Sequence, residues 1–492
     1  MMSEKTAEKK NLKPLWIFVA FAALTIVKLL PIGSDSLPAA GHTALAILAF
    51  AVIMWVTEAV SYPVSSAMIL ALIAVLMGLG PALEDPTAIM GTSAALKMAL
   101  GGFSSASVAL VGAALFLAAA MQVTNLHKRI ALWILSMVGT KTNALVVGAI
   151  LVSIVLAFVV PSATARAGAV VPILLGIVAA FGLAKESKLA ALLIITATQA
   201  VSIWNVGIKT AAAQNMVALG FISSEFGVDI SWLEWFIFAV PFSVLMSIAL
   251  YFIMIKLIKP ETDNVTGGKE VIRQQLAELG PMKRREITLI IVSALLLFLW
   301  ATEKILHPFD STTVTIFAIA FLLTPYVGVF TWKEASSRID WGTLIVFAVG
   351  ISLGTILLNT NGAAWLSDKV FGSLGLDSMP ILATIALVTI FNILIHLGFA
   401  SATSLASALI PVFIALAVTL PDVDHIGFVL IQQFVICFGF LLPVSAPQNM
   451  LAYGTGSFTT KDFLKSGIPL TIFGYILILI FSATYWKWIG LL

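Results

Sequence analysis

The sequence has little charge. Only 10% of its 492 residues are Asp, Glu, Lys or Arg, and 60% are hydrophobic, whereas about a quarter of a typical soluble domain is charged. The mean hydropathy is +1.07. Uncharged apolar runs of roughly 18 residues or more recur along the whole chain, which is the pattern of membrane-spanning helices. This scarcity of charge excludes an ordinary soluble domain and predicts an all-α polytopic membrane protein.

Cysteine is also scarce. The single Cys437 excludes a disulfide framework and a thiolate metal cluster. The chain lacks a glycine-rich phosphate loop, a His-x-x-x-His pair and a cluster of carboxylates, so we expect neither a metal site nor a soluble catalytic domain. The formal net charge of +3 points to no particular partner, and we expect no nucleic acid.

Eleven spanning helices are expected in the chain. Residues 1–14 are charged, lack a signal-peptide cleavage site and predict a cytoplasmic tail. Two hydrophobic stretches, 142–182 and 379–420, are too long for one helix, and a central Ser-Ala-Thr interrupts each of them. We interpret both as re-entrant hairpins. The expected crossings lie near 15–30, 43–57, 64–80, 104–123, 188–219, 232–257, 287–305, 312–330, 341–359, 427–455 and 467–489.

The distribution of Lys and Arg predicts the orientation. With a cytoplasmic N-terminus, eleven crossings place the C-terminus outside, provided each hairpin enters and leaves on one side. Of the 27 Lys and Arg, 20 are then cytoplasmic, four are outside and three (Lys28, Arg166 and Lys209) lie at membrane depth. This bias satisfies the positive-inside rule and would be lost if each hairpin crossed once. We expect a plasma (inner) membrane protein.

The two halves of the chain resemble each other. AQNMVA (213–218) and PQNMLA (447–452) are 234 residues apart, and VGAALFL (111–117) and VGISLGT (349–355) are 238 apart. The Ser-Ala-Thr motifs are 239 apart, and three matches in one order at nearly one offset indicate a duplication. An odd number of crossings separates the two units, which predicts an inverted repeat, the architecture of many secondary transporters.

Each unit is expected to contain a hairpin followed by a broken helix. The first unit covers 15–258, with hairpin 142–182 and broken helix 188–219; the second covers 287–492, with hairpin 379–420 and broken helix 427–455. Between them, the polar segment 259–286 predicts an amphipathic cytoplasmic linker. A separate function of this linker is the less favoured alternative.

The hairpin tips are candidates for binding an anion. Non-helical backbone at membrane depth is tolerated where it lines a cavity. Hydroxyl groups there supply donors, and the helix after each tip points its positive end at the same place. Two tips therefore predict a two-pronged anion receptor, although small residues also let membrane helices pack closely. The tip residues are Ser162, Ala163 and Thr164, and Ser401, Ala402 and Thr403.

Helix-breaking residues mark the second part of each candidate site. NVGIKTAAAQNM (205–216) and LPVSAPQNML (442–451) place Gly, Pro, Ser, Thr and Asn where a helix would otherwise continue. Proline removes a backbone donor and frees a carbonyl group. The alternative is a kink without function. The candidate residues in the breaks are Thr210, Asn215, Ser445, Pro447 and Asn449.

Three basic residues lie near the tips and breaks: Arg166, Lys209 and His396. A Lys or Arg at the centre of a spanning helix costs about 3 kcal/mol on the mildest scale and marks function by default. Glu58 is the main acidic candidate to neutralise them, so unpaired cations suit a substrate that carries its own negative charge. The structural alternatives are that Arg166 ties down backbone carbonyls, that Lys209 reaches an interface and that His396 is a satisfied buried polar group.

On these residues the chain resembles the divalent-anion:sodium symporter family of di- and tricarboxylate carriers. The resemblance covers nearly the whole length and includes WVTEAVSYPV (55–64), NLHKRIAL (125–132), both tips and both Asn-containing breaks. It implies eleven helices, two re-entrant hairpins, a dimeric scaffold and an elevator-type transport domain.

The tips depart from the family motif, Ser-Asn-Thr, whose residues contact substrate carboxylates and help to enclose Na⁺. Here Ala163 and Ala402 replace both asparagines, which keeps the hydroxyls and removes the amides. Tips of this kind resemble the sodium-independent exchanger branch of the family. The resemblance implies a homodimeric exchanger of C4 and C5 dicarboxylates (malate, succinate or 2-oxoglutarate type) in the bilayer, with citrate or tartrate next, and neither Na⁺ nor another cofactor.

Three alternatives stay open from the sequence. The nearest is a sodium-coupled symporter that holds the ion with backbone carbonyls and hydroxyls alone. A passive anion channel is disfavoured because doubled hairpins suit occlusion better than an open pore. An intramembrane hydrolase using Ser401 and His396 is disfavoured, since their spacing of five on one segment fits a hydrogen-bonded pair poorly and no acid follows to orient the histidine. We therefore expect no enzyme.

Overall fold

The structure is a computed structural model that describes residues 13–31, 37–139, 141–261, 268–421 and 423–492. Within these ranges the secondary structure is helical, with two isolated β-bridges. Nine helices in the described ranges are long and apolar enough to cross a membrane. The expected tail, apart from Lys13 and Pro14, and positions 262–267 of the expected linker lie outside the described residues. The total of eleven crossings stays a prediction.

The first half of the chain forms a group of helices, a helical hairpin and a broken helix. Its helices are α1 (Lys13–Leu29), α2 (Ala39–Thr57), α3 (Tyr62–Leu72) with a π turn (Ile73–Met77), α4 (Thr92–Leu100) with a 3₁₀ turn (Gly101–Ser104), α5 (Ala106–Thr124), α6 (Leu126–Val138), α7 (Thr142–Val159), α8 (Ala163–Ala180), α9 (Lys188–Gly207), the 3₁₀ turn η3 (Lys209–Ala211), α10 (Ala213–Phe226) and α11 (Trp232–Leu257).

The second half repeats the order of elements from α5 to α11 after four further helices, α12 to α15. It contains α12 (Gly268–Glu278), α13 (Arg284–Ala301), α14 (Ser311–Leu323), α15 (Trp332–Ser336), α16 (Trp341–Asn359), α17 (Gly362–Phe371) with two 3₁₀ turns (Gly372–Leu374 and Leu376–Ser378), α18 (Ile381–His396), α19 (Ala402–Thr419), α20 (His425–Ile436), the 3₁₀ turn η6 (Pro443–Ser445), α21 (Pro447–Tyr453), α22 (Thr460–Ala483) and α23 (Tyr485–Trp488).

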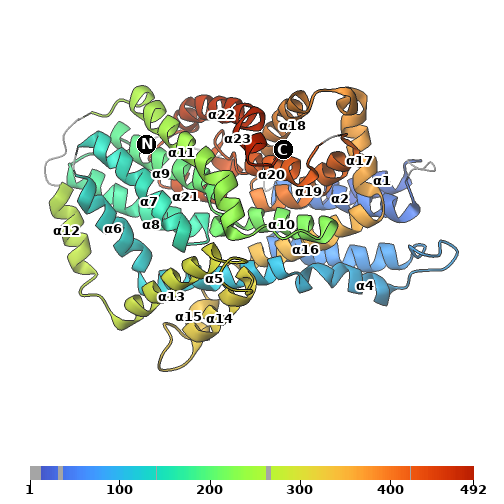
Figure 1. The fold of residues 1–492 in the computed structure, drawn as a ribbon, viewed down its shortest axis with the longest axis horizontal. Coiled ribbons are helices and arrows are strands. Elements are labelled where there is room, and N and C mark those ends of the chain that lie inside the picture. Colours follow the sequence, from blue (N-terminus) through green and yellow to red (C-terminus); the bar gives the residue numbers. More distant parts are fainter. Residues whose placement is uncertain (1–12, 32–36, 140, 262–267, 422) are drawn as a thin grey trace, which may run out of the picture.

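Both long hydrophobic stretches fold as two helices that meet at Ser-Ala-Thr. The hairpin α7–α8 packs on α9, and the hairpin α18–α19 packs on α20. The hairpins also cross over, since α8 packs on α21 and α19 packs on α10. Each tip therefore lies against the broken helix of the other half. In Figure 1, α9, α10, α20 and α21 lie between an edge formed by α11 and α22 and an edge formed by α4, α5 and α16.

Helices α6 and α17 are not among the helices expected from the sequence. Each follows a longer helix directly, after an asparagine in the left-handed conformation: Asn125 (φ 57°) follows α5 and Asn361 (φ 58°) follows α16. With 13 and 10 residues they are too short to span a bilayer. Charged residues inside both also keep their local hydropathy low. Their equivalent positions support the duplication.

Some predicted boundaries are wrong: the last expected helix, 467–489, begins early, at Thr460, and the helix expected over 312–330 ends early, at Leu323. The following residues include Pro325, Tyr326 in a left-handed conformation (φ 70°) and Gly328. Proline removes a backbone donor and positive φ interrupts the helix, so an apolar composition alone extends the predicted helix too far.

The linker contains the amphipathic helix α12, which packs on α6 and α8. Its Ile272 is buried, and beyond its end the side chain of Arg129 in α6 donates to Glu286 Oε2 at 2.7 Å and to the carbonyl oxygen of Gly280 at 3.0 Å. The linker is therefore attached to the segment that leads into the first hairpin.

Candidate functional site

A cavity of about 620 Å³ lies between the two hairpin tips, the two breaks and α5. Both tips and the first residues of α10 and α21 form one wall. The other wall carries polar residues from the end of α5, the start of α6 and the start of α16. The polar and charged residues that line the cavity as a whole include Tyr62, Gln122, Asn125, His127, Lys128, Ser162, Thr164, Asn205, Gln214, Arg338, Asp340, Thr343, His396, Ser401, Thr403 and Gln448. Ala163, Ala402 and Pro447 line it as well.

The two tip serines have the same local geometry. Ser162 caps α8 by accepting the backbone N–H of Ala165 at 3.3 Å, and Ser401 caps α19 by accepting that of Ser404 at 3.3 Å. A hydroxyl that accepts from the backbone keeps its own proton for donation. Both 18-residue helices also direct their positive ends at the tips. The arrangement suits the binding of a carboxylate at each tip.

Asn215 and Asn449 hold the two breaks in the same way. The amide of Asn215 donates to the carbonyl oxygens of Asn205 (2.7 Å) and Ile208 (3.3 Å), ten and seven residues earlier. The amide of Asn449 donates to those of Gly439 (2.7 Å) and Leu442 (3.5 Å), again ten and seven residues earlier. These carbonyls lack helical partners where the helix is interrupted. The asparagines therefore stabilise the breaks from behind the cavity wall.

Arg166 is completely buried behind the first tip. Its Nη2 donates to Asn205 Oδ1 at 2.5 Å and to the carbonyl oxygen of Ala211 at 3.0 Å. Its Nε and Nη1 have no hydrogen-bond partner within the described residues. Asn205, the first of these partners, itself lines the cavity. The guanidinium thus places a positive charge directly behind the wall of the cavity.

His396 reaches the second break. Its Nε2 lies 3.4 Å from the carbonyl oxygen of Ser445, which accepts a hydrogen bond in the tautomer that has the proton on Nε2. Ser445 is the last residue of η6 and precedes Asn449 by four residues, as Ala211 is the last residue of η3 and precedes Asn215 by four. The two basic side chains therefore contact equivalent carbonyls in the two breaks.

The structure does not bring Lys209 to this cavity, which corrects its expected place beside the tips. Lys209 lines a second cavity of about 610 Å³ on the other side of the first break, together with Asp229 and Glu303. Its Nζ donates to the carbonyl oxygen of Ile230 at 2.6 Å. The backbone turns between Lys209 and Gln214, so the two side chains face opposite cavities. Thr210 is buried within η3 between them.

Glu58 also differs from expectation, because it lies exposed at the end of α2. It accepts a hydrogen bond from the Tyr62 hydroxyl at 2.7 Å rather than neutralising one of the buried cations. Tyr62 lines the cavity and lies close to the hydroxyls of Ser401 and Ser404. Its presence in the quoted motif WVTEAVSYPV was the available signal, and sequence reasoning missed it.

Two glutamines were missed as well. Gln214 and Gln448 are the second residues of α10 and α21, and both line the cavity. They stand directly before the asparagines in AQNMVA and PQNMLA, so the repeated motif contained them. They were not predicted because the breaks were identified by helix-breaking residue types, and glutamine does not break a helix.

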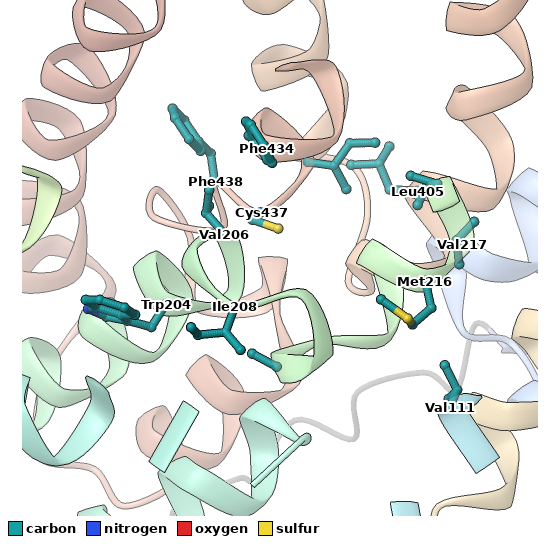
Figure 2. Close-up of a cluster of buried hydrophobic side chains, with 14 of the residues drawn as sticks. Val111, Trp204, Val206, Ile208, Met216, Val217, Leu405, Phe434, Cys437 and Phe438 are labelled. Atoms are coloured by element: carbon teal, nitrogen blue, oxygen red, sulfur yellow. The ribbon is translucent and has the colours of Figure 1, made fainter. Parts of the chain in front are cut away.

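Apolar side chains enclose the breaks. Figure 2 shows Trp204, Val206 and Ile208 near the end of α9, with Phe434, Cys437 and Phe438 of the second half close by. All six are almost fully buried. Water is thus kept from the rear of the breaks, where polar contacts are stronger than in an aqueous site.

Comparisons with known proteins agree with this architecture. Residues 9–492 match the family model described as "Sodium:sulfate symporter transmembrane region". The chain is 50% identical to a protein named "Membrane protein" from Cupriavidus necator, covering 96% of this chain and 92% of that one. It is 27% identical to the sodium-dependent dicarboxylate transporter SdcS of Staphylococcus saprophyticus (97% and 92% covered). It is 29% identical to the citrate/succinate antiporter of Escherichia coli K12 (82% of each covered).

A solved structure has the same fold. The YdaH transporter of Alcanivorax borkumensis superposes with a TM-score of 0.54 at 15% sequence identity, covering 88% of this chain and 98% of that chain. The match over residues 9–492 extends across both halves, including both tips and both breaks. The chain therefore belongs to the divalent anion:Na⁺ symporter family of dicarboxylate and citrate transporters, and it is a membrane transporter rather than an enzyme.

Proposed function

We propose that the protein exchanges C4 and C5 dicarboxylates, such as malate, succinate or 2-oxoglutarate, across the membrane without sodium and by an elevator mechanism. One observation carries the proposal: Arg166 and His396 contact equivalent carbonyl groups in the two breaks, at Ala211 and Ser445. Broken helices of transporters use such carbonyl groups to coordinate Na⁺. Here basic side chains of the protein occupy their neighbourhood.

The composition of the tips supports the same proposal. Ala163 and Ala402 offer no amide oxygen to an ion, while Ser162 and Ser401 keep their hydroxyls in the cavity. Each carboxylate of a substrate would accept hydrogen bonds at one tip and lie near the positive end of the helix that follows. The buried guanidinium of Arg166 lowers the cost of taking a dianion out of water. No bound metal ion is then needed to balance the substrate.

The same charge favours exchange over one-way transport. A carrier that returned empty would move the uncompensated guanidinium of Arg166 through an apolar environment, which is costly. With a dicarboxylate bound, the moving body is better balanced. The antiporter named among the relatives fits this proposal, whereas the sodium-dependent dicarboxylate transporter SdcS favours the alternative, a sodium-coupled symporter.

The contact between α16 and the hairpin–break body supports an elevator movement. A Cβ added to Gly350 would lie 2.1 Å from Ser407 Oγ of α19, and one added to Gly354 would lie 2.2 Å from Phe221 of α10. At these two glycines the backbone of α16 lies directly against α19 and α10, the elements proposed to move. No side chain of α16 projects between them there. We propose that these surfaces slide within a homodimer. The cavity lining includes Lys128 and Arg338, both on the side predicted to be cytoplasmic.

Exchange in proteoliposomes tests the proposal. Uptake of radiolabelled succinate is measured into vesicles loaded with succinate or left without carboxylate, in Na⁺, K⁺ or choline media. We expect the same rate in all three media and at least tenfold faster uptake into loaded vesicles, a difference of about 1.4 kcal/mol in activation free energy. A steep dependence on Na⁺ would establish the symporter alternative. Full-rate accumulation in vesicles without carboxylate would contradict obligatory exchange.

A further inference from the structure

The two cavity glutamines occupy equivalent positions but have different partners. Gln448 Nε2 donates to Ser202 Oγ at 3.1 Å, a normal hydrogen bond to a hydroxyl. Within the described residues, Gln214 Nε2 donates only to a sulfur, the Sγ of Cys437 at 3.6 Å. Sulfur is a weak acceptor. The amide of Gln448 is therefore engaged with the protein, whereas that of Gln214 is held weakly.

The surroundings of Gln214 do not compete strongly for its amide. The Cys437 thiol is also shared with Asn215 Oδ1, at 3.6 Å, and with Gln433 Nε2, at 3.9 Å. Asn215 is already bonded to backbone carbonyls and to Gln433. Gln214 and Cys437 both line the cavity, and the exposed fraction of Gln214 is only 7%. A ligand that engages this amide would exchange a contact with sulfur for a stronger bond to oxygen.

We propose that Gln214 recognises a hydroxyl group on the carbon chain between the two carboxylates, so that the site prefers hydroxylated dicarboxylates over unsubstituted ones. This inference rests on the proposed function, in which the two tips bind the carboxylates. The first residues of α10 and α21 then flank the middle of the substrate. A carboxamide has both a donor and an acceptor, as a hydroxyl has, so the two groups are complementary. Gln448 does not share this role because Ser202 already engages its donor.

A comparison of substrates on the unmodified protein is the first test. Malate, 2-methylsuccinate and succinate compete for exchange of radiolabelled succinate in proteoliposomes. Malate and 2-methylsuccinate have nearly the same shape and differ in a hydroxyl against a methyl group. We expect malate to compete about fivefold better than 2-methylsuccinate, within the range of one neutral hydrogen bond. Equal competition by these two compounds would overturn the inference without any variant.

Two matched variants provide the second test. Gln214→Met keeps the length of the side chain and removes its amide, and Gln448→Met is the control at the equivalent position. Gln214→Met should weaken competition by malate about fivefold more than competition by succinate. Gln448→Met should change both substrates by the same factor. A malate-selective loss in Gln448→Met, or an unchanged ratio in Gln214→Met, would contradict the assignment. If the unmodified protein exchanged no dicarboxylate, the proposed function itself would fail, which is a separate outcome.

Discussion

The two breaks share a backbone design and differ in the basic side chain that contacts each of them. Asn215 and Asn449 donate to carbonyls at the same two sequence separations, so the two breaks match in single hydrogen bonds. The basic residues do not follow this rule. Arg166 lies four residues after Ser162, whereas His396 lies five residues before Ser401. One comes from the helix after its tip and the other from the helix before it.

The two basic side chains therefore do not occupy equivalent positions in the two halves of the chain. A duplicated basic residue would lie at the same distance from its tip in both halves, whereas Arg166 and His396 lie on opposite sides of their tips. Instead, two unrelated positions supply side chains that converge on the equivalent carbonyls of Ala211 and Ser445. Both breaks thus have a carbonyl group that contacts a basic side chain, but that side chain comes from a different sequence position in each half. A site that needs a donor at that point explains this better than close packing does.

The two contacts also differ in strength. Arg166 makes two hydrogen bonds, at 2.5 and 3.0 Å, and its charge is fixed. His396 makes one contact at 3.4 Å, and a histidine can carry its proton without a net charge. The tips differ in the same sense, since Thr164 is exposed to the cavity while Thr403 is only 7% exposed. The first tip and its break should therefore dominate the binding of substrate.

Replacing Arg166 should have the largest effect. Arg166→Gln removes the fixed charge behind the cavity, and we expect exchange to fall at least tenfold, about 1.4 kcal/mol in transition-state free energy. Arg166→Lys should recover part of the loss, because it keeps the charge but loses the planar fork that reaches Asn205 and Ala211 together. Rates are measured in proteoliposomes containing equal amounts of protein.

Folding of the Arg166 variants needs its own control. Removing a buried charge also removes its desolvation cost, so the Gln variant should insert and elute in detergent like the unmodified protein. If Arg166→Gln is well folded and exchanges at a near-normal rate, the tips and helix ends alone form the anion site. The comparison between the two breaks would then concern structure and not transport.

Replacing His396 should have a smaller effect. His396→Gln leaves a side chain that donates to the carbonyl of Ser445, so we expect a reduction of only about threefold, the range of one neutral hydrogen bond. His396→Leu removes the donor and should be worse than Gln by a further small factor. Initial rates of exchange for both variants are compared with that of Arg166→Gln. A loss in His396→Gln that equals the loss in Arg166→Gln would show that the two breaks contribute alike.

The helices and breaks that form the site could be predicted from the sequence more easily than the side chains that line its cavity. The hairpins and breaks were predictable because small residues, proline and glycine stand out in an apolar background. The tip residues 162–164 and 401–403 and His396 do line the cavity. Gln214 and Gln448 were missed because which side of a broken helix a residue faces depends on the turn between its parts. Short helices such as α6 were missed because length and hydropathy identify only helices that cross.

Lys209 lies in the predicted broken helix but faces the second cavity instead of the tips. Its substitution should therefore have the smallest effect on substrate binding. Its Nζ donates to the carbonyl of Ile230 in the second cavity, near Glu303 and Asp229, and Gln at this position keeps a donor. The lysine donates to Ile230, which does not line the first cavity, so we expect its coupling to the substrate site to stay within about 0.5 kcal/mol, or about twofold. Lys209→Gln should therefore change the dissociation constant for succinate by less than about twofold, measured by equilibrium binding to purified protein. Lys304→Gln, which alters the other lysine of that cavity, is the matched control and should behave alike.

If Lys209→Gln alone weakened binding as much as Arg166→Gln, the positive charge of the substrate site would extend through the first break, and the contrast between its two faces would disappear.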